Sequence, residues 1–368
     1  MVRVLQIFTI LNRGGAETNI MNYYRHLDRS AVHFDFLVHR PETGAYEAEI
    51  RSLGGEIFRL PPINPFKIHS YKAAVKKFFD QYSDYDIIHG QNSELGVYIY
   101  EEAKRRGIPV IIAHAHSSTM SLDIKSIFRY LWKLKLRKHV TTYFTCGSAA
   151  ATYLFGEKLS KKSIQINNAV DCERLAYNRF TREHFRNKLG VGVRNILHVG
   201  SFNKIKNHRF LIEIWSALIK IAPESKLFLV GDGVLKLGIV KLVKQLNLDT
   251  SIIFLGSRND VPDILMAMDV FILPSLYEGV PVSLVEAQAS GIHCVISDGI
   301  PSEAVLVNQN VTIVSLGESA SSWAEKIVQL DLSNRNDVSE IIKAKGYDIK
   351  ENAIRLQNKY IELLEKNT

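Results

Sequence analysis

The stretch Val270-Phe-Ile-Leu273 is a short apolar run, and the similar run Cys294-Val-Ile-Ser297 follows it after the helical pattern Leu284–Ser290. Short apolar runs without polar alternation are typical of strands that a parallel sheet buries on both faces. A strand, a helix and a second strand in this order form the repeating unit of such a sheet. The stretch therefore predicts an α/β fold.

The same alternation extends outward over the whole chain. In the second half, further strands are expected at Ile196–Val199, Lys226–Val230, Ile252–Leu255 and Thr312–Val314. In the first half, strands are expected at Val2–Thr9, Phe34–Val38, Ile57–Leu60, Ile87–His89, Val110–Ala113, Tyr143–Cys146 and Ser163–Ile166. Because helical patterns separate these runs, the sequence predicts two Rossmann-like domains with doubly wound parallel sheets, facing each other across a cleft.

The domain boundaries are expected where the strand pattern stops and restarts. This gives an N-terminal domain of residues 1–172 and a C-terminal domain of residues 193–349. Residues 173–192 have weak periodicity and many polar side chains, and we expect a linker there. Residues 350–368 are expected to include an amphipathic helix that packs back on the N-terminal domain.

The composition restricts the class of protein. The 368 residues are 46% hydrophobic and 23% charged, which excludes disordered, collagen-like and disulfide-framework proteins. The spacings of Cys146, Cys172 and Cys294 suit neither a disulfide framework nor a zinc site. No segment reaches about 18 consecutive apolar residues, as a membrane span would need. Met1–Phe8 is interpreted as a strand rather than a signal peptide, so we expect a cytoplasmic protein.

The positive charge is concentrated in the first half of the chain. Residues 1–172 carry 23 Lys and Arg against 16 Asp and Glu, whereas residues 173–368 carry 23 against 22. This surplus favours an anionic partner, but no pattern of a nucleic-acid-binding module is present. The segment Lys125–His139 is basic, contains no acid and has an apolar stripe. Such a helix either lies on an anionic membrane surface or covers the sheet as an ordinary solvated helix.

Two polar motifs follow predicted strands of the first domain, where ligands of parallel sheets bind. Gly14 and Gly15 precede a helix that contains Glu17, and the free amides of a helix N-terminus attract phosphates and sugars. An ordinary Gly-Gly turn explains the same residues. His114 and His116 end another strand and could contact a sugar or exchange protons. They are equally well explained as structural histidines, and no third ligand completes a metal site beside them.

The second domain has two further motifs at strand ends. Lys206 lies in the loop after Ile196–Val199, and its point charge suits a phosphate. The segment Glu278-Gly-Val-Pro-Val-Ser-Leu-Val-Glu286 places two carboxylates around a loop that exposes amides. Such a loop could bind a diphosphate while the carboxylates accept hydrogen bonds from sugar hydroxyls. The simpler alternatives are a solvated Lys206 and a Glu286 that only stabilises the start of a helix.

Two other motifs bear on metals and dinucleotides. Asp84-Tyr-Asp86 has the D-x-D pattern associated with metal-dependent sugar transfer, but it precedes a predicted strand and so lies away from the ligand edge. Gly231-Asp-Gly233 resembles a dinucleotide loop, but Lys236 stands where the third glycine would be needed. The sequence therefore predicts no metal site and gives NAD little support.

Taken together, the motifs resemble the family 4 retaining glycosyltransferases of the bacterial exopolysaccharide and capsule type. The resemblance spans about Val2 to Tyr360. The matching segments are Gly14–Glu17, His116 (with His114 as second choice), Asn168–Asp171, the loop of Lys206, and Leu273–Gly291 with Glu278 and Glu286. One residue departs from the family pattern, because Ser201 replaces the arginine that shares the donor diphosphate with the lysine. Arg258 is the candidate substitute.

The resemblance implies the GT-B fold and a hexosyltransferase-type reaction. A sugar would move from a nucleotide diphosphate-sugar, most often a UDP-sugar in this family, to a saccharide acceptor on a lipid carrier. The configuration would be retained, and no metal or other cofactor would be needed. Lys206 and the amides of Gly279 and Val280 would stabilise the leaving diphosphate. Glu278 would hold sugar hydroxyls, and Glu286 would hold the ribose.

The resemblance also assigns residues of the first domain. His116 would be catalytic together with Lys206 and Glu278, Gly14 and Gly15 would contact the donor, and His114 and Glu17 would lie on the acceptor side. The expected role is surface polysaccharide synthesis at the inner face of the plasma membrane. Two alternatives stay open: a nucleotide-sugar epimerase of the same shape, and a non-catalytic nucleotide-sugar-binding subunit.

Overall fold

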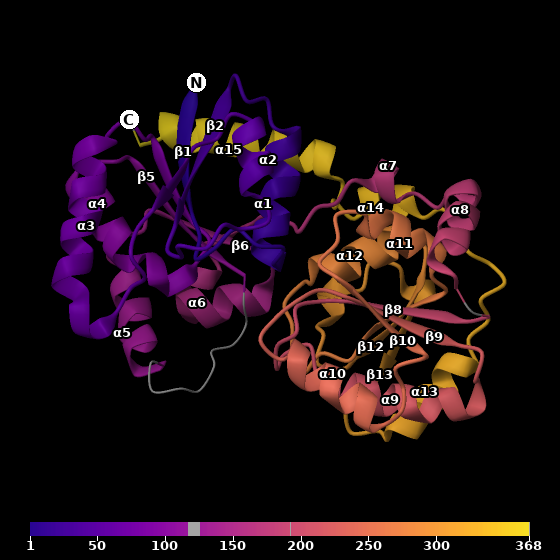
Figure 1. Ribbon diagram of the computed structural model, residues 1–368. Helices are drawn as coiled ribbons and strands as arrows, with labels where there is room; N and C mark the ends of the chain where they lie inside the picture. Colours follow the sequence, from indigo (N-terminus) through magenta and orange to yellow (C-terminus); the bar gives the residue numbers. More distant parts are fainter. Residues whose placement is uncertain (117–125, 192, 368) are drawn as a thin grey trace. The chain divides into compact units, whose positions relative to one another are not determined.

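The computed structural model describes residues 1–116, 126–191 and 193–367. All the named strands in these ranges belong to two parallel sheets (Figure 1). Each sheet lies in its own unit. Unit 1 comprises Met1–Ala169 and Ile349–Thr368, and unit 2 comprises Val170–Asp348.

The sheet of unit 1 has the strand order β3-β2-β1-β4-β5-β6-β7. Its strands are β1 Val2–Ile7, β2 Val32–Val38, β3 Ile57–Arg59, β4 Ile87–Gly90, β5 Val110–Ala115, β6 Thr142–Thr145 and β7 Ile164–Gln165. The order reverses between β1 and β4. The carboxyl ends of these two strands therefore form the switch point at which doubly wound sheets bind ligands.

Helices cover both faces of this sheet, because successive residues of its central strands are buried on opposite faces. Alternate strand residues such as Leu5 and Val4 belong to separate cores on the two faces. The helices of unit 1 are α1 Gly15–His26, α2 Glu47–Ser52, α3 Ile68–Gln81, α4 Val97–Arg105, α5 Ser126–Leu136, α6 Ser148–Ser160 and α15 Ile349–Glu365, with short 3-10 turns at Pro65–Lys67 and Ser93–Gly96. The last helix, α15, packs beside α1 and contributes Tyr360 to its core (Figure 1).

The sheet of unit 2 has the order β10-β9-β8-β11-β12-β13, with the switch point between β8 and β11. Its strands are β8 Asn195–Val199, β9 Lys226–Val230, β10 Ile252–Gly256, β11 Val270–Leu273, β12 His293–Ser297 and β13 Val311–Val314. Its helices are α7 Cys172–Leu175, α8 Arg179–Leu189, α9 His208–Ile221, α10 Lys236–Gln245, α11 Val261–Ala267, α12 Val282–Ala289, α13 Ala320–Val328 and α14 Ser339–Ala344, with 3-10 turns at Ser302–Ala304 and Asn308–Asn310.

The sequence suggested a linker at 173–192, but within the described residues 173–191 the chain forms most of α7 and all of α8, and both belong to unit 2. Within it, α8 has no fully buried residue, and only Phe185 and Leu189 pack, partly buried, against the unit 2 core, so its apolar stripe is narrower than in most helices. Its ends are nevertheless well defined. The Asn178 side chain caps the first turn by accepting from the backbone N–H of Thr181, and Gly190 ends the helix with a φ of 57°.

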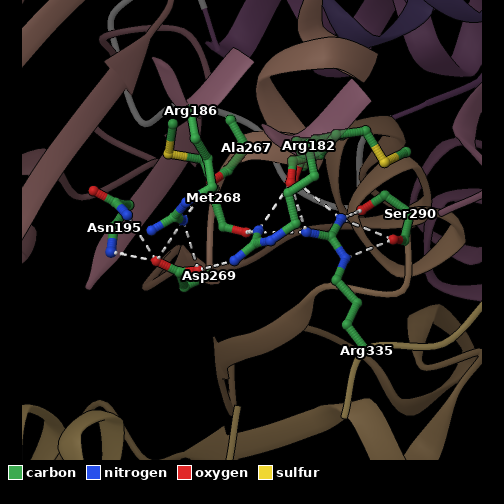
Figure 2. A network of polar contacts seen from close by, with 10 residues as sticks. Arg182, Arg186, Asn195, Ala267, Met268, Asp269, Ser290 and Arg335 are labelled. Atoms are coloured by element: carbon green, nitrogen blue, oxygen red, sulfur yellow. Dashed lines mark hydrogen bonds and ion pairs between the residues drawn. The ribbon is translucent and has the colours of Figure 1, made fainter. Parts of the chain in front are cut away.

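An arginine network fixes α8 to the amino end of β11 (Figure 2). Arg182 and Arg186 form ion pairs with Asp269, which also accepts hydrogen bonds of 2.8 Å from the backbone and side-chain amides of Asn195. Arg335 donates to the backbone carbonyls of Leu265, Met266, Met268 and Ser290. The three guanidiniums thereby satisfy the carbonyls at the carboxyl end of α11, which no helical amide can reach.

None of the helices in the described ranges is both long enough and apolar enough to cross a membrane.

Candidate active site

Lys206 lies at the carboxyl end of β8, in a loop that is fixed to the loop after β11. Asn207 adopts a left-handed conformation with a φ of 54° immediately before α9. Its side chain donates to the carbonyl of Pro274 at 3.2 Å, and the Leu276 amide donates to the Ile205 carbonyl at 2.8 Å. These bonds bring Lys206 close to the segment that contains Glu278.

Lys206 and Glu278 form an ion pair at this edge of the sheet. The Lys206 Nζ lies 2.7 Å from the Glu278 Oε1, and the two side chains are 14% and 15% exposed. The pair is therefore shielded enough for its electrostatics to be strong, yet it remains in contact with solvent. The sequence motifs that contain these two residues meet in the structure.

Glycines allow the neighbouring loops to approach Lys206 closely. A Cβ at Gly200 would lie 3.0 Å from the Lys206 Cδ and 3.1 Å from the His198 Nε2. Gly231, with a φ of 139°, packs against the Gly200 backbone, and a Cβ there would lie 2.1 Å from the Gly200 carbonyl oxygen. Side chains at either position would push the β8 and β9 loops apart and displace the lysine.

Two buried histidines lie behind Lys206, and neither was among the site residues expected from the sequence. His198 donates from Nδ1 to the carbonyl of Ile272 at 2.9 Å, and His208 stacks on Phe202 with ring centroids 4.0 Å apart. Burial, reinforced by the Lys206 charge, lowers the pKa of His208 to about 4. Burial also lowers the pKa of His198 well below its usual value, and the charges of His208 and Lys206 add to this effect. Both imidazoles are thus neutral at pH 7, so Lys206 supplies the positive charge here.

The loop that contains Gly279 and Val280 leads into α12. Both residues are buried, Pro281 precedes the first helical turn, and the Glu278 amide donates to the Gly299 carbonyl at 3.2 Å. Glu286 is half-buried within α12. Of the two carboxylates of the motif, Glu278 therefore lies on the loop and Glu286 on the helix that follows it.

Arg258, the expected substitute for the family arginine, is engaged elsewhere. Its guanidinium makes two hydrogen bonds to Asp260, of 2.8 and 2.5 Å, just before α11. The hydrogen bond to Asp260 is the main cause that raises the pKa of Arg258. Contact of its Nε or Nη2 with a donor would require this pair to open.

In unit 1, Glu17 folds back over Gly14 at the start of α1. A Cβ at Gly14 would lie 2.3 Å from the Glu17 Oε2, whereas a Cβ at Gly15 would meet no atom within 4 Å. Burial raises the pKa of Glu17 to about 7. The carboxylate thus stands beside the helix N-terminus that the sequence assigned to a ligand.

His114 and His116 lie next to each other at the end of β5, with ring centroids 4.0 Å apart. His116 is half-buried, and its Nε2 lies 2.6 Å from the Gln91 Oε1. His114 has no exposed surface, so it faces other side chains rather than a surface on which an acceptor could bind. Gln91, which follows β4, was absent from the sequence-based candidates.

Within the residues that the structure describes, no three His, Cys, Asp or Glu side chains gather as metal ligands. The D-x-D motif has a structural environment, since Asp86 accepts a hydrogen bond from the Arg3 backbone and Asp84 pairs with the Arg3 side chain. Independence from a metal stays a prediction.

Comparison with known proteins agrees with this geometry. The sequence model of Glycosyltransferase Family 4 matches residues 13–174, and that of Glycosyl transferases group 1 matches residues 193–331. The putative glycosyltransferase EpsF of Bacillus subtilis is 33% identical over 99% of this chain and 98% of its own length. The chain belongs to the family 4 glycosyltransferases. The predicted family and enzyme class are confirmed.

Solved structures confirm the GT-B fold of this glycosyltransferase. HepE of Anabaena, in complex with UDP-glucose, superposes with a TM-score of 0.80 at 18% identity, and each chain is covered completely. Sucrose-phosphate synthase of Thermosynechococcus elongatus gives a TM-score of 0.78 at 16% identity with the same coverage. At these identities the likeness concerns the fold alone.

Proposed function

We propose that this glycosyltransferase moves a sugar from a nucleotide diphosphate-sugar to a lipid-linked saccharide in surface polysaccharide synthesis, with retention of configuration and without a metal. The observation that carries the donor assignment is the partly shielded Lys206–Glu278 pair at the carboxyl edge of the unit 2 sheet. One relative, from Escherichia coli, is a UDP-Gal:α-D-GlcNAc-diphosphoundecaprenol α-1,3-galactosyltransferase, 26% identical over 76% of both chains. Another is the capsular polysaccharide biosynthesis glycosyltransferase CapH of Staphylococcus aureus.

In this proposal the donor diphosphate takes the place of Glu278 on the Lys206 ammonium. Glu278 is then released to accept hydrogen bonds from the sugar hydroxyls, while Glu286 accepts them from the ribose. The bond between the anomeric carbon and the diphosphate oxygen breaks, and the acceptor oxygen bonds to that carbon. The nucleoside diphosphate leaves with the bonding pair, and its oxygen takes the proton that the acceptor hydroxyl loses. Until then its growing charge needs Lys206 and the amides near Gly279. His116 contacts the transferred sugar.

A pocket in unit 1 supports an anionic, sugar-bearing acceptor. It has a volume of about 140 Å³ and contains two guanidiniums, from Arg40 and Arg129, together with the Trp132 ring. The buried amide atoms of the Asn92 side chain have no hydrogen-bond partner. The remaining lining residues are Thr9, His39, Pro62, Ile63, Pro65 and Leu95. Arginine binds phosphate oxygens in a bidentate manner, and an indole packs well against a sugar face.

The exposed face of α5 supports a membrane contact. The apolar stripe that the sequence indicated does not cover the sheet. Ile127, Tyr130, Leu131 and Leu134 are 68%, 54%, 54% and 42% exposed, whereas Trp132 and Leu136 are buried. An exposed apolar stripe on a basic helix fits the interface of an anionic membrane. Lys125, which the sequence included in this segment, lies outside the described residues.

The donor site is tested with Lys206→Ala and Glu278→Gln. We expect each to lower the transfer rate at least tenfold, about 1.4 kcal/mol of barrier, because the leaving diphosphate or the sugar loses its partner. Lys326→Ala breaks an exposed ion pair with Glu318 in the same unit and should leave transfer unchanged. Full activity in both site variants would overturn the proposal. A donor that is epimerised without any acceptor would favour the alternative enzyme.

The membrane contact is tested by sedimentation with anionic vesicles. Ile127→Ser with Leu131→Ser should release the protein from the vesicles, because it removes the apolar anchors but no charge. Val234 and Leu237 are 91% and 78% exposed in unit 2, so their serine variants are the matched control and should still sediment. Equal binding of both pairs of variants would refute the contact.

A further inference from the structure

A chain of buried polar side chains runs through unit 1 from the C-terminal helix to His116. The Tyr360 hydroxyl, on α15, lies 3.4 Å from the Gln6 Nε2, and the Gln6 Oε1 lies 2.8 Å from the Gln91 Nε2. The Gln91 Oε1 in turn contacts the His116 Nε2 at 2.6 Å. A hydrogen-bonded path thus joins a residue near the end of the chain to the histidine at the end of β5.

A branch of the same network runs through two further histidines. The His89 Nδ1 lies 2.7 Å from the Tyr360 hydroxyl, and its Nε2 lies 3.2 Å from the His114 Nδ1. The His114 ring stacks on that of His116. The His116 imidazole is therefore held at its Nε2 by an amide and on one face by a second imidazole.

The sheet explains why these residues meet. Gln6 on β1 is in register with His89 on the neighbouring strand β4, so both side chains point to the same face. His114 stands on β5, the next strand. Tyr360 closes the cluster from α15 and packs on Phe144 and Phe34. Gln6, His89, His114 and Tyr360 are all completely buried.

The hydrogen bonds run in one direction. A carbonyl oxygen only accepts, so the contact with the Gln91 Oε1 requires the proton of His116 to be on Nε2. The Gln91 and Gln6 amides donate onward, and the Tyr360 oxygen accepts. The Tyr360 proton then goes to the His89 Nδ1, and the His89 Nε2 donates to His114. Every donor along this path has an acceptor as far as the His114 Nδ1, so neutral His114 carries its own proton on Nε2, and that buried N–H has no acceptor.

The network contains no formal charge. Burial lowers the pKa of His116 to about 4, and it lowers the pKa values of His89 and His114 well below the usual range. Burial also raises the pKa of Tyr360, so its hydroxyl keeps its proton. An aspartate or glutamate in place of Gln91 would favour an imidazolium, whereas the amide keeps the ring neutral.

We propose that Gln91 and Tyr360 are positioning residues that hold His116 as the Nε2–H tautomer and thereby present the lone pair of its Nδ1 to a hydroxyl of the reacting sugars. The inference rests on the proposed role of His116 in transfer. Gln91 acts on the imidazole directly, and Tyr360 acts through Gln6 and His89. The C-terminal helix is in this way part of the catalytic support and not only a cover of the sheet.

The test uses the full chain and the variants Gln91→Leu, Tyr360→Phe and His116→Ala. We expect kcat to fall at least tenfold for Gln91→Leu and about threefold to tenfold for Tyr360→Phe, with the donor KM within twofold of the parent. Tyr24→Phe is the control. Its hydroxyl is also buried in this core but donates to the backbone of Phe34, so kcat should not change.

Two readouts separate positioning from a structural role. Tyr360→Phe should have no further effect on kcat in a His116→Ala background, because both changes act through one imidazole. In the parent, ¹⁵N NMR of the His116 ring should report a proton on Nε2. A proton on Nδ1, or additive effects in the double variant, would overturn the proposal even if Gln91→Leu folds poorly. Full activity of His116→Ala would instead remove the proposed role of His116 and leave the Lys206 site untouched.

Discussion

The two units each contain a buried polar network, and the networks differ in charge and in how they end. In unit 2, Arg182, Arg186 and Arg335 meet Asp269 and the carbonyls of α11 at the amino end of β11 (Figure 2). In unit 1, neutral amides, imidazoles and a phenol lead to the half-buried His116 at the carboxyl end of β5. The first network is closed and serves stability, whereas the second ends on a residue that can meet a substrate.

The network of unit 2 is charged and the network of unit 1 is neutral, and each state suits what the network contacts. Burial and the charge of Arg182 lower the pKa of Arg335 to about 9. Arg335 therefore stays protonated at neutral pH, and its charged guanidinium continues to donate to the carbonyls. A buried charge is tolerated only when it is well paired, and removing one partner is strongly destabilising. A neutral network contributes less charge-based stability, but it keeps an imidazole uncharged near pH 7.

The largest effect is expected from Asp269→Asn. The change leaves Arg182 and Arg186 facing a neutral amide, and we expect the free energy of unfolding to fall by about 3 kcal/mol. Chemical denaturation measures this. Asp263→Asn is the control, because its partner Arg174 is 50% exposed and the pair should contribute less than about 1 kcal/mol. Equal losses in the two variants would show that the unit 2 network is no more than a set of surface ion pairs.

Sequence reasoning found the fold because the apolar runs and their order are local signals. Val270–Leu273 and its neighbours are strands of parallel sheets, and the loops after them contain Lys206 and Glu278 as expected. The α8 helix was missed because its apolar stripe is narrow: only Phe185 and Leu189 pack, partly buried, against the core. Asn178 and Gly190 are typical residues for the start and the end of a helix, and both are visible in the sequence. Without a clear apolar stripe between them, they were not enough to predict the helix.

The networks could not be predicted because they join residues far apart in the chain. His89 was expected only as the end of a strand, and nothing in its neighbourhood indicates a contact with Tyr360, 271 positions away. Arg258 illustrates the opposite case. Its partner Asp260 stands two residues further along the chain, so the ion pair that occupies its guanidinium could have been anticipated from the spacing.

The next largest effect is expected from lowering the pH, because the two networks should lose stability in different pH intervals. The pKa values of His89, His114 and His116 are lower in the folded state, so the unfolded state binds more protons below about pH 6.5. Stability should therefore decrease from about pH 6.5 to about pH 4. The folded-state pKa of Asp269 lies below its usual 3.8, and its contribution should persist until the pH falls further.

The comparison is made by measuring unfolding against pH for the parent and for Asp269→Asn. The variant should lower the whole curve without altering its slope between pH 6.5 and 4, because Asp269 stays ionised throughout this interval. A parent curve that is flat over the interval would mean that the histidines are not held neutral. A flatter slope in the variant alone would mean that Asp269 titrates with them.

Glu17 provides a smaller effect of opposite sign. Because burial raises its pKa to about 7, the folded state holds its proton longer than the unfolded state, and the contribution of Glu17 to stability should decrease as pH rises from about 4.5 to 7. Glu17→Gln should remove this decrease. Glu42→Gln, at an exposed position in the same unit, should retain it. If the difference between parent and Glu17→Gln does not vary with pH, then the folded state does not raise the pKa of this carboxyl.

The smallest effect is expected from the glycine pair at the start of α1, and it tests whether Glu17 or the helix itself sets the stability there. Gly15→Ala places a Cβ in open space at the first helical residue, and we expect a gain of about 0.5 kcal/mol because alanine has the higher helix propensity. Gly14→Ala places a Cβ within 2.3 Å of the Glu17 Oε2 and should push that carboxylate toward water. Its pKa should then return toward 4.5, which pH titration of stability measures. A raised pKa that survives Gly14→Ala would show that the close contact with Gly14 does not hold the carboxylate in its buried place.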